Sequence, residues 1–339
     1  MVEVLVTGGA GFIGSNFVRY ALRTHPDWQI TTLDKLTYCG RRENLHDVID
    51  DSRHTFVHGD IANAAVAGPL VQASDLVIHF AAETHVDRSL LCAGEFIRTD
   101  IFGTFVLLEA ARQAPRLRRF IQISTDEVYG SVSTGHSVET DELKPRNPYS
   151  ASKAGADRLA YSYWATYQVP VIITRASNNY GPYQFPEKVI PLFITNLIEG
   201  GTVPLYGDGM NVRDWLHVDD HCRGIDVAVD RGAPGEVYNI GGGNEIPNLT
   251  LTKRILALLD KPDSCITPVA DRVGHDRRYA LSTSKLEGLG WKPLVPFEDG
   301  LRATVDWYRT NAWWWQPIKR EDPAFKAYYQ QQYTQRSAS

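Results

Sequence analysis

The sequence predicts an α/β fold of the Rossmann type, in which a doubly wound parallel sheet carries a smaller C-terminal substrate-binding region. In the first half of the chain, short apolar segments rich in Val, Ile and Phe alternate with stretches long enough for helices. A turn with three spaced glycines directly follows the first apolar segment, and turn signals become denser from about residue 182 onward. Buried strands that alternate with helices favour a parallel sheet covered on both faces. Right-handed crossovers then make the sheet doubly wound.

The individual elements follow from length and apolar periodicity. Strands are expected at Val2–Val6, Ile30–Leu33, Thr55–His58, Leu76–Phe80, Phe120–Ser124 and Val171–Thr174. Helices are expected near Gly14–Thr24, Ile101–Gln113, Ser150–Tyr167, Thr250–Asp260 and Phe297–Asn311.

Composition excludes several classes of protein. Of 339 residues, 43% are hydrophobic and 22% are charged, which is typical of globular proteins and unlike disordered chains. The net charge of −5 gives no general attraction to phosphate backbones, so no nucleic-acid partner is expected. The four cysteines lack Cys-x-x-Cys spacing, so neither a zinc site nor a disulfide framework is expected.

The N-terminal segment enters a strand without a basic stretch and an apolar core, so no signal peptide is expected. An apolar run of about 18 residues, the length that spans a membrane, does not occur in the sequence. These observations predict a cytoplasmic protein with no membrane partner.

The glycine-rich turn predicts a dinucleotide site. Gly8, Gly11 and Gly14 stand between the first strand and the first helix. Such spacing lets a pyrophosphate approach the backbone at a helix N-terminus and lets the helix pack closely on the sheet. Asp34 comes 20 residues after Gly14, at the end of the second strand. A carboxylate there accepts hydrogen bonds from ribose hydroxyls and repels the additional phosphate of NADP, so NAD is the expected cofactor.

Arg41 and Arg42 lie a few residues downstream and favour NADP in principle, but Asp34 holds the position that decides between the two cofactors. Two further segments fit the same ligand. Gly59-Asp60-Ile61 follows the third strand and fits an adenine contact, and Ala81-Ala82 follows the fourth and fits a close backbone approach.

Three side chains form a candidate catalytic set for the oxidation of an alcohol. Thr125 follows the fifth strand, and Tyr149 and Lys153 are spaced i, i+4 on one face of the next helix. A phenol with a pKa of about 10 is a poor base at neutral pH, but an ammonium and a positive nicotinamide favour its phenolate. Tyr149 could then remove the hydroxyl proton while Thr125 holds the same oxygen.

These residues resemble the extended short-chain dehydrogenase/reductase superfamily. More specific segments resemble the family of dTDP-glucose 4,6-dehydratases over residues 2 to 315, with one departure, Val273, where that family usually has proline. The segments are Ala81–Ser89, Thr125–Gly130, Arg175–Pro191, Asn211–His217 and Gly274–Tyr279.

The resemblance implies a reaction beyond simple oxidation. A keto group at sugar carbon 4 acidifies the proton on carbon 5, and loss of water across carbons 5 and 6 then needs a base and an acid. The resemblance implies Glu127 as this base and Asp126 as this acid, and environments that separate their pKa values would allow the two roles. Hydride returned to carbon 6 leaves the NAD oxidised.

The resemblance also implies the remaining site residues, with a nucleotide-diphosphate sugar, preferably dTDP-glucose, as substrate. Arg213 suits the diphosphate because a guanidinium binds phosphate oxygens bidentately. The expected substrate-binding residues are Thr84, Thr125, Asn178, Lys188, Val189, Leu192, Pro204, Tyr206, Arg213, Asn248, Arg272 and His275. The expected cofactor-binding residues are Gly8, Gly11, Phe12, Ile13, Gly14, Asp34, Lys35, Thr37, Asp60, Ile61, Ala81, Ala82, Thr99, Tyr149, Lys153 and Asn179.

Other readings remain open. A UDP-sugar 4,6-dehydratase, a nucleotide-sugar 4-epimerase and a UDP-glucuronate decarboxylase share the cofactor site, but the last two do not require the acid–base pair. A non-catalytic NAD-binding regulator would be expected to lose Thr125, Tyr149 or Lys153, and all three are present.

The chain is therefore expected to divide into an NAD-binding domain with the catalytic residues (1–180), a nucleotide-sugar-binding region (181–315) and a polar tail (316–339), although the chain interleaves near the first boundary. The run Ala312-Trp-Trp-Trp315 predicts a structural cap, because tryptophan side chains cover large apolar areas when they pack.

The resemblance implies a homodimer formed by the helices expected at Ile101–Gln113 and Ser150–Tyr167.

Overall fold

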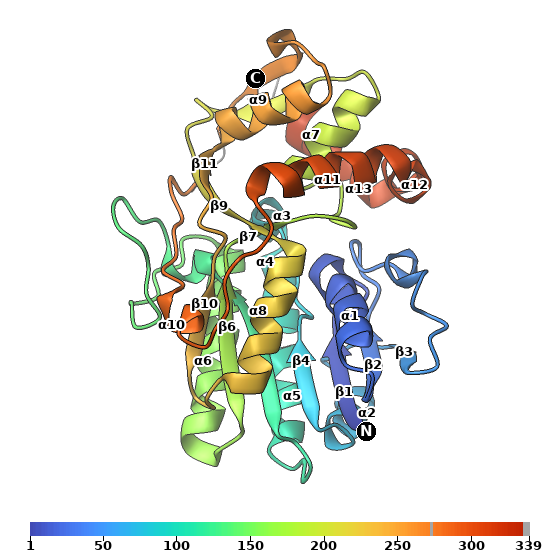
Figure 1. Ribbon diagram of the computed structural model, residues 1–339, viewed down its shortest axis with the longest axis vertical. Coiled ribbons are helices and arrows are strands. Elements are labelled where there is room, and N and C mark those ends of the chain that lie inside the picture. Colours follow the sequence, from blue (N-terminus) through green and yellow to red (C-terminus); the bar gives the residue numbers. More distant parts are fainter. Residues whose placement is uncertain (272–273, 335–339) are drawn as a thin grey trace.

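The computed structural model describes residues 1–271 and 274–334. The expectations for Arg272 and Val273 lie outside the described residues. A seven-stranded sheet with the order β10-β6-β5-β4-β1-β2-β3 forms the lower part of the molecule (Figure 1). All its neighbouring strands are parallel. The strands are β1 (Val2–Thr7), β2 (Trp28–Asp34), β3 (His54–His58), β4 (Leu76–His79), β5 (Arg119–Thr125), β6 (Val171–Ala176) and β10 (Val237–Ile240).

The predicted doubly wound sheet is confirmed. Successive residues of β1 point to opposite faces, as the strand geometry requires. Val4 and Val6 pack with residues of α1 (Phe12–Thr24) and α8 (Val218–Arg231). Leu5 packs on the other face with residues of α2 (Ala64–Gln72), α5 (Thr104–Ala111) and α6 (Pro148–Tyr167). Both faces are therefore covered, which accounts for the continuous apolar character of the strands.

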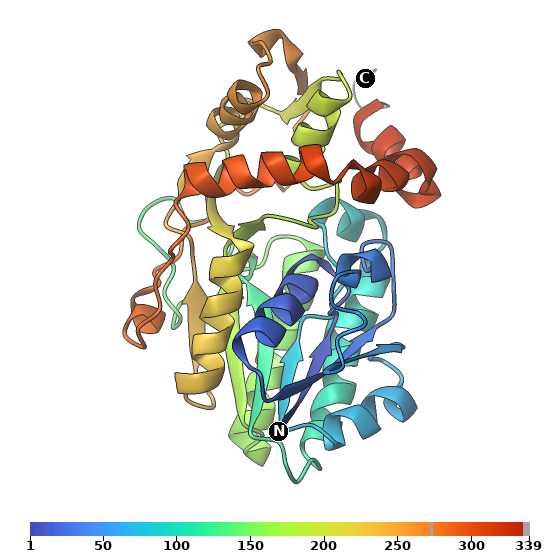
Figure 2. The same cartoon turned by 45° about the vertical axis from the view of Figure 1, so that its right-hand side comes forward.

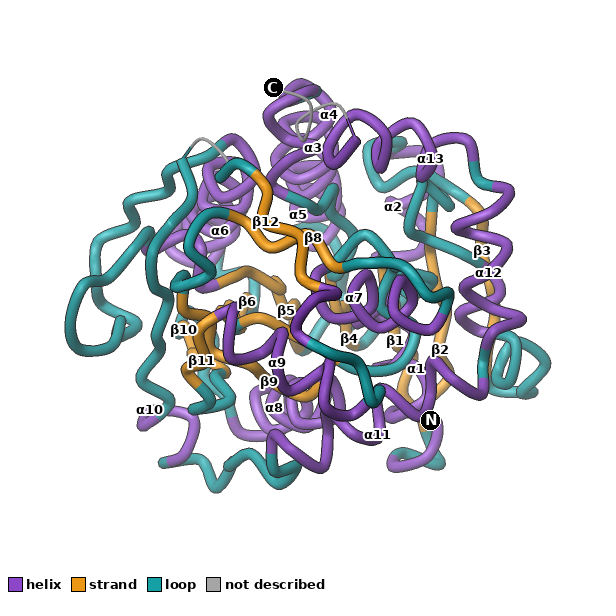
Figure 3. Tube along the Cα trace, turned by 90° about the horizontal axis from the view of Figure 1, so that it is seen from above, coloured by secondary structure: helices purple, strands orange, loops and turns teal. Residues whose placement is uncertain are grey.

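The second part of the molecule lies above the carboxyl ends of the strands (Figures 1 and 3). Its core brings together side chains of five helices. These are α7 (Val189–Ile198), α9 (Asn248–Leu258), α11 (Phe297–Thr310), α12 (Ala312–Glu321) and α13 (Pro323–Tyr329). A three-stranded and a two-stranded sheet complete this part: β7 (Asn178–Tyr180), β9 (Val212–His217) and β11 (Glu245–Pro247), with β8 (Val203–Tyr206) and β12 (Ile266–Val269).

The chain crosses between the two parts more than once. After β7 to β9 in the upper part, it returns through α8 to place β10 beside β6 at the edge of the large sheet. The remaining helical elements are short: α3 (Val86–Leu91), α4 (Ala93–Phe96), α10 (Ser284–Glu287), the π-helical segments Ile97–Gly103 and Gln330–Thr334, and 3₁₀ turns at Arg42–Leu45, Asp126–Tyr129 and Asp263–Cys265.

One predicted helix differs from the structure. The helix expected from Ile101 begins as an α-helix only at Thr104, after the π-helical segment Ile97–Gly103. Within this segment, the carbonyl oxygen of Asp100 accepts a hydrogen bond from the Thr104 hydroxyl at 2.5 Å. Single π turns inside helices often occur near functional sites, and this one carries Thr99 and Asp100.

The C-terminal tail is helical as far as the structure describes it. Trp314 and Trp315 are buried in the upper core, where their indole nitrogens donate to Asn44 and to the Tyr308 carbonyl oxygen. These contacts agree with the predicted cap, whereas Trp313 is 48% exposed. Figure 2 shows the last helices in red, beside α7 at the upper part of the molecule. Among the described residues, no helix has both the length and the apolar character needed to cross a bilayer.

Candidate active site

A pocket of about 400 Å³ is lined by residues from the carboxyl ends of the strands and from the upper part of the molecule. This is where open α/β sheets bind their ligands. Every predicted site residue that the structure describes lines it. They are Gly8, Gly11, Phe12, Ile13, Gly14, Asp34, Lys35, Thr37, Asp60, Ile61, Ala81, Ala82, Thr84, Thr99, Thr125, Asp126, Glu127, Tyr149, Lys153, Asn178, Asn179, Lys188, Val189, Leu192, Pro204, Tyr206, Arg213, Asn248 and His275.

The glycine turn brings the backbone close to the pocket, so that a ligand can contact the main chain directly. Gly8 has a φ of +71°, and a Cβ there would lie 2.5 Å from the backbone nitrogen of Ala81. A Cβ on Gly14 would collide with the carbonyl oxygen of Gly8. Gly11 directly precedes α1, whose first amide groups therefore face the pocket side of the turn. The turn is thus a tight anion-binding element of the kind that holds a pyrophosphate.

Asp34 is buried at the end of β2, where its carboxylate accepts hydrogen bonds from the backbone amides of Ala10 at 2.9 Å and Leu36 at 2.8 Å. A carboxylate has about four acceptor positions, so capacity for ribose hydroxyls remains. The two arginines that could favour NADP do not line the pocket. Arg41 lies 3.6 Å from Glu43, and Arg42 lies over the Phe56 ring at 5.0 Å.

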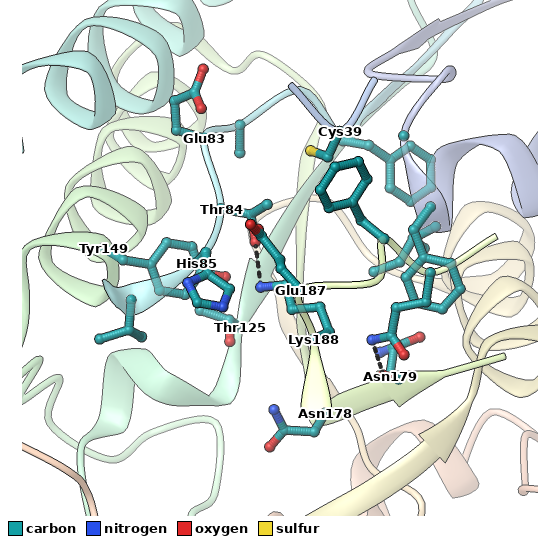
Figure 4. Close-up of a pocket in the computed structure, with 18 of the residues that line it drawn as sticks. Cys39, Glu83, Thr84, His85, Thr125, Tyr149, Asn178, Asn179, Glu187 and Lys188 are labelled. Atoms are coloured by element: carbon teal, nitrogen blue, oxygen red, sulfur yellow. Dashed lines mark hydrogen bonds between the residues drawn. The ribbon is translucent and has the colours of Figure 1, made fainter. Parts of the chain in front are cut away.

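The candidate oxidation residues converge from two elements. Thr125 ends β5, and Tyr149 and Lys153 lie one turn apart on α6. The Lys153 ammonium is buried and donates to the carbonyl oxygen of Ile123 at 2.7 Å, which fixes the side chain against β5. Figure 4 shows Tyr149 and Thr125 on the same side of the pocket. The structure therefore brings together the three residues that the spacing predicted.

The surroundings of Tyr149 in the chain alone oppose its phenolate form. Burial raises the pKa of Tyr149 well above its ordinary value, and the carboxylates Glu127 and Asp100 raise it further, while a hydrogen bond with Thr125 opposes them. Burial also lowers the pKa of Lys153. In the chain alone, burial and the nearby carboxylates therefore disfavour the phenolate of Tyr149, which the positive charge of a bound oxidised nicotinamide would favour.

The adjacent carboxyl groups have different surroundings. Asp126 is 2% exposed, and burial raises its pKa well above the ordinary value, with Glu127 and Asp214 adding to the effect. Its Oδ1 accepts from the Thr125 hydroxyl at 3.2 Å, and its Oδ2 has no hydrogen-bond partner among the described residues. Glu127 is only half-buried, and the Tyr279 hydroxyl donates to its Oε2 at 3.5 Å. The raised pKa favours the acid form of the buried Asp126, beside a second carboxyl group that is more exposed, and different surroundings of this kind suit the separate acid and base roles of an elimination.

Cationic and polar side chains also line the pocket. The Lys188 ammonium donates to the Thr84 hydroxyl at 3.2 Å (Figure 4). Arg213 is buried over the ring of Tyr279, with two guanidinium nitrogens on backbone carbonyl oxygens. The side-chain oxygens of Asn178 and Asn248 have no hydrogen-bond partner within the described part of the chain. Buried amide oxygens without a partner are expected where a ligand supplies the donors.

Sequence reasoning missed several pocket residues. Among these are Glu83, His85 and Asp87, which lie inside the Ala81–Ser89 segment but were not assigned a role, and Glu187, which forms an ion pair with Arg88 at 2.8 Å. The resemblance of the whole Ala81–Ser89 segment could have indicated Glu83, His85 and Asp87. The neighbouring opposite charge of Lys188 could have indicated Glu187. Tyr333 also lines the pocket, and no signal in the polar tail pointed to it.

Comparisons with known proteins agree with this geometry. The family model described as GDP-mannose 4,6-dehydratase matches residues 5–304. A dTDP-glucose 4,6-dehydratase of Streptomyces antibioticus is 52% identical over 325 residues, covering 94% of this chain and 96% of the relative. The structure of a dTDP-glucose 4,6-dehydratase from Streptomyces venezuelae, solved with NAD and dTDP bound, has a TM-score of 0.92 and 52% identity, covering 94% of this chain and all of the other. A UDP-glucuronic acid 4-epimerase of Bacillus cereus has a TM-score of 0.86 at 28% identity, covering 91% of this chain and 99% of the other.

The sheet and the pocket define an extended short-chain dehydrogenase/reductase. The epimerase has the same fold, so the fold alone does not distinguish epimerisation from dehydration. Sequence identity does distinguish them, at 52% with the dehydratase and 28% with the epimerase. The chain belongs to the nucleotide-sugar 4,6-dehydratase family and, within it, to the dTDP-glucose 4,6-dehydratases.

Proposed function

We propose that the protein converts dTDP-D-glucose to dTDP-4-keto-6-deoxy-D-glucose with tightly held NAD. The observation that carries this proposal is the Asp126–Glu127 pair, in which a buried acid and a half-buried carboxylate stand beside Thr125 at one wall of the pocket. Oxidation at carbon 4 needs only Thr125, Tyr149 and Lys153. The pair supplies the acid and the base that loss of water requires in addition.

The residues present fit NAD. Gly8 and Gly14 have no space for a Cβ, Asp34 keeps acceptor capacity, and neither nearby arginine lines the pocket. Bound NAD would supply the hydride chemistry, in which carbon 4 is oxidised and carbon 6 is later reduced. The chain's own residues orient the sugar, hold its hydroxyl groups and move the protons.

Each proton step has an assigned side chain. Tyr149 takes the proton from the carbon-4 hydroxyl, Thr125 holds that oxygen, and the Lys153 ammonium favours the phenolate. Glu127 then removes the proton from carbon 5, which the new keto group acidifies. Asp126 donates its proton to the hydroxyl that leaves carbon 6, consistent with the raised pKa of this carboxyl group.

The substrate contacts are part of the same proposal. Arg213 and Lys188 supply positive charge for the diphosphate, and Asn178 and Asn248 accept hydrogen bonds through oxygens that lack a partner among the described residues. Tyr206 borders the base, and Thr84 the sugar. His275 lies near Tyr206, with ring centroids 6.1 Å apart.

The reaction is tested by mass spectrometry of dTDP-glucose incubated with the protein in deuterated water and catalytic NAD. We expect a product lighter by one water that carries solvent deuterium at carbon 5, without any net oxidant. A product of unchanged composition would identify a 4-epimerase instead. Loss of carbon dioxide from UDP-glucuronate would identify a decarboxylase, and turnover of UDP-glucose alone would move the proposal to a UDP-sugar 4,6-dehydratase.

The cofactor preference is tested at Asp34. In Asp34→Asn we expect the ratio of NAD to NADP affinity to fall about 10- to 100-fold, because a hydrogen bond to a charged group contributes roughly 1.5–3 kcal/mol and the repulsion of a 2′-phosphate is removed. Affinities are measured on protein stripped of nucleotide. Arg42→Ala is the control, since Arg42 lies over Phe56 outside the pocket. A lower NADP affinity in that control would assign Arg42 a role in cofactor choice.

Three further expectations stay predictions: a boundary near residue 180, a cytoplasmic location and a homodimer. For the dimer, the helical face around α5 and α6 is a suitable surface. It exposes the apolar side chains Phe102, Phe105, Tyr161 and Tyr167, each at least 38% exposed. A patch of this kind favours association with a second copy of the chain.

A further inference from the structure

A buried ion pair outside the pocket joins α6 to β6. Arg175 on β6 is 1% exposed, Asp157 on α6 is 0% exposed, and neither lines the pocket. The guanidinium donates to both carboxylate oxygens of Asp157, from Nε at 2.8 Å and from Nη2 at 3.0 Å. Tyr149, Lys153 and Asp157 follow one another at intervals of four residues, so they lie along one side of α6. Arg175 is therefore fixed to the helix that carries the residues proposed for the oxidation of carbon 4.

The same guanidinium also bonds to the turn that carries Asp126 and Glu127. Nη1 of Arg175 donates to the Tyr129 hydroxyl at 2.7 Å, and the guanidinium carbon lies 4.8 Å from the centre of the Tyr129 ring. Tyr129 is the last residue of that 3₁₀ turn. Its hydroxyl donates in turn to Oδ1 of Asn239 on β10 at 2.8 Å. One side chain of the turn is thus held by the neighbouring strands β6 and β10.

The donors and acceptors of this network match one another. The Tyr129 phenol accepts one hydrogen bond and donates one, and burial raises its pKa to about 12, so it stays a neutral donor. Asn239 is 0% exposed, and its amide nitrogen donates to the Ser137 carbonyl oxygen at 3.1 Å. A guanidinium presents its donors in a rigid plane, so it fixes the directions of its partners. Because desolvation offsets much of the attraction in a buried ion pair, these directions are the more informative feature of the network.

We propose that Arg175 and Tyr129 are positioning residues for the elimination of water, and that they hold the Asp126–Glu127 turn in a fixed place relative to α6. The inference rests on the proposed function, since it concerns the acid and the base of that reaction. Neither residue contacts the substrate in this proposal. Both act through the turn that carries the two carboxyl groups.

The network bears on elimination more than on oxidation. Thr125 is the last residue of β5, and Lys153 bonds to a carbonyl oxygen of the same strand, so the sheet itself anchors these two residues. The Asp126–Glu127 pair lies in the turn beyond the strand end, where Tyr129 supplies directional hydrogen bonds to β6 and β10. Loss of these bonds should displace the acid and the base and leave oxidation nearly intact.

The test compares the two steps in Tyr129→Phe, in Arg175→Lys and in the double variant. Phe keeps the ring and loses the hydroxyl, whereas Lys keeps a charge beside Asp157 but has no rigid fork to join Asp157 to Tyr129. Because a displacement of about 1 Å can slow a reaction about 10²-fold, we expect dehydration and carbon-5 proton exchange to fall about 5- to 100-fold in either variant. Single-turnover oxidation of carbon 4, the Kd for dTDP and the NAD content should stay close to their wild-type values. The double variant should lose no more than the slower single variant, because both changes break one connection.

Tyr163→Phe is the matched control. Tyr163 lies on α6, is 6% exposed and donates to Glu109 at 2.6 Å, so this change also removes a buried hydroxyl and its hydrogen bond, away from the turn. Its Tm should fall about as much as that of Tyr129→Phe, with oxidation and elimination both at the wild-type rate. Tyr129→Phe and this control decide the matter by themselves if Arg175→Lys does not fold.

A purely structural role of the network would affect both steps together. The inference is overturned if Tyr129→Phe slows oxidation and elimination by the same factor, or if it exchanges the carbon-5 proton at the wild-type rate. Losses that multiply in the double variant would also overturn it, because the two residues would then act independently. Failure of the proposed function is visible separately in the wild-type protein, which would release no water from dTDP-glucose.

Discussion

Replacing Tyr149 by Phe is expected to slow hydride transfer from carbon 4 by about 10²- to 10⁴-fold, the usual contribution of a positioned general base. Phe keeps the ring and its edge contact with Phe96, but it removes the oxygen that takes the hydroxyl proton. The measurement is the rise of reduced-nicotinamide absorbance in a single turnover with dTDP-glucose. Binding of dTDP changes little, because the residues proposed for the base and the diphosphate are Tyr206, Arg213 and Lys188 and not Tyr149.

Tyr161→Phe is the matched control for this variant. Tyr161 lies on the same helix, 38% exposed, and does not line the pocket. Tyr161→Phe loses the same hydroxyl group without a change at the reacting atoms, so this variant should transfer hydride at the wild-type rate. Near-normal hydride transfer in Tyr149→Phe would remove Tyr149 from the role of base.

The central fold was predictable because its signals are local. Strands buried on both faces are continuous apolar runs, so all six predicted strands match β1 to β6 to within two residues at each end. The seventh strand, β10, was not assigned because Val237–Ile240 is short and lies among turn residues. Its place beside β6 depends on α8 crossing the sheet, which is a tertiary contact and not a property of the segment.

The site was predictable where a motif fixes a residue's position, and less so where distant segments meet. Gly8, Asp34, Tyr149 and Lys153 are set by strand ends and helix spacing, so their convergence follows from the parallel sheet. Tyr333 enters from a segment whose composition is polar, and only packing against Tyr206 brings it to the pocket. The raised pKa of Tyr149 is not visible in the sequence, because burial is its largest cause and that burial is a property of the assembled site.

Glu127→Gln is expected to separate oxidation from elimination. The amide cannot remove the carbon-5 proton, so dehydration and the exchange of that proton with deuterated solvent both fall by about 10²- to 10⁴-fold, while oxidation at carbon 4 continues. The variant also has a predictable pH dependence. Glu127 raises the pKa of Tyr149, so its neutralisation lowers that pKa and shifts the rising limb of carbon-4 oxidation to lower pH. Reduced-nicotinamide absorbance and mass spectrometry follow the two steps separately. Dehydration at the wild-type rate would show that Glu127 is not the base.

Asp126→Asn is the complementary variant, because it removes the acid and leaves the base. Exchange at carbon 5 should persist, whereas loss of the carbon-6 hydroxyl should fall by a factor similar to that in Glu127→Gln, since a neutral amide has no acidic proton to give. The side chain of Asn is nearly the same size as that of Asp, and its oxygen can still accept from Thr125, as Asp126 does at 3.2 Å. Opposite behaviour of the two variants, with exchange lost in one and kept in the other, would assign the two carboxyl groups individually. If both variants lost exchange equally, the two groups would act as one unit, and the environments of Asp126 and Glu127 would not set separate roles.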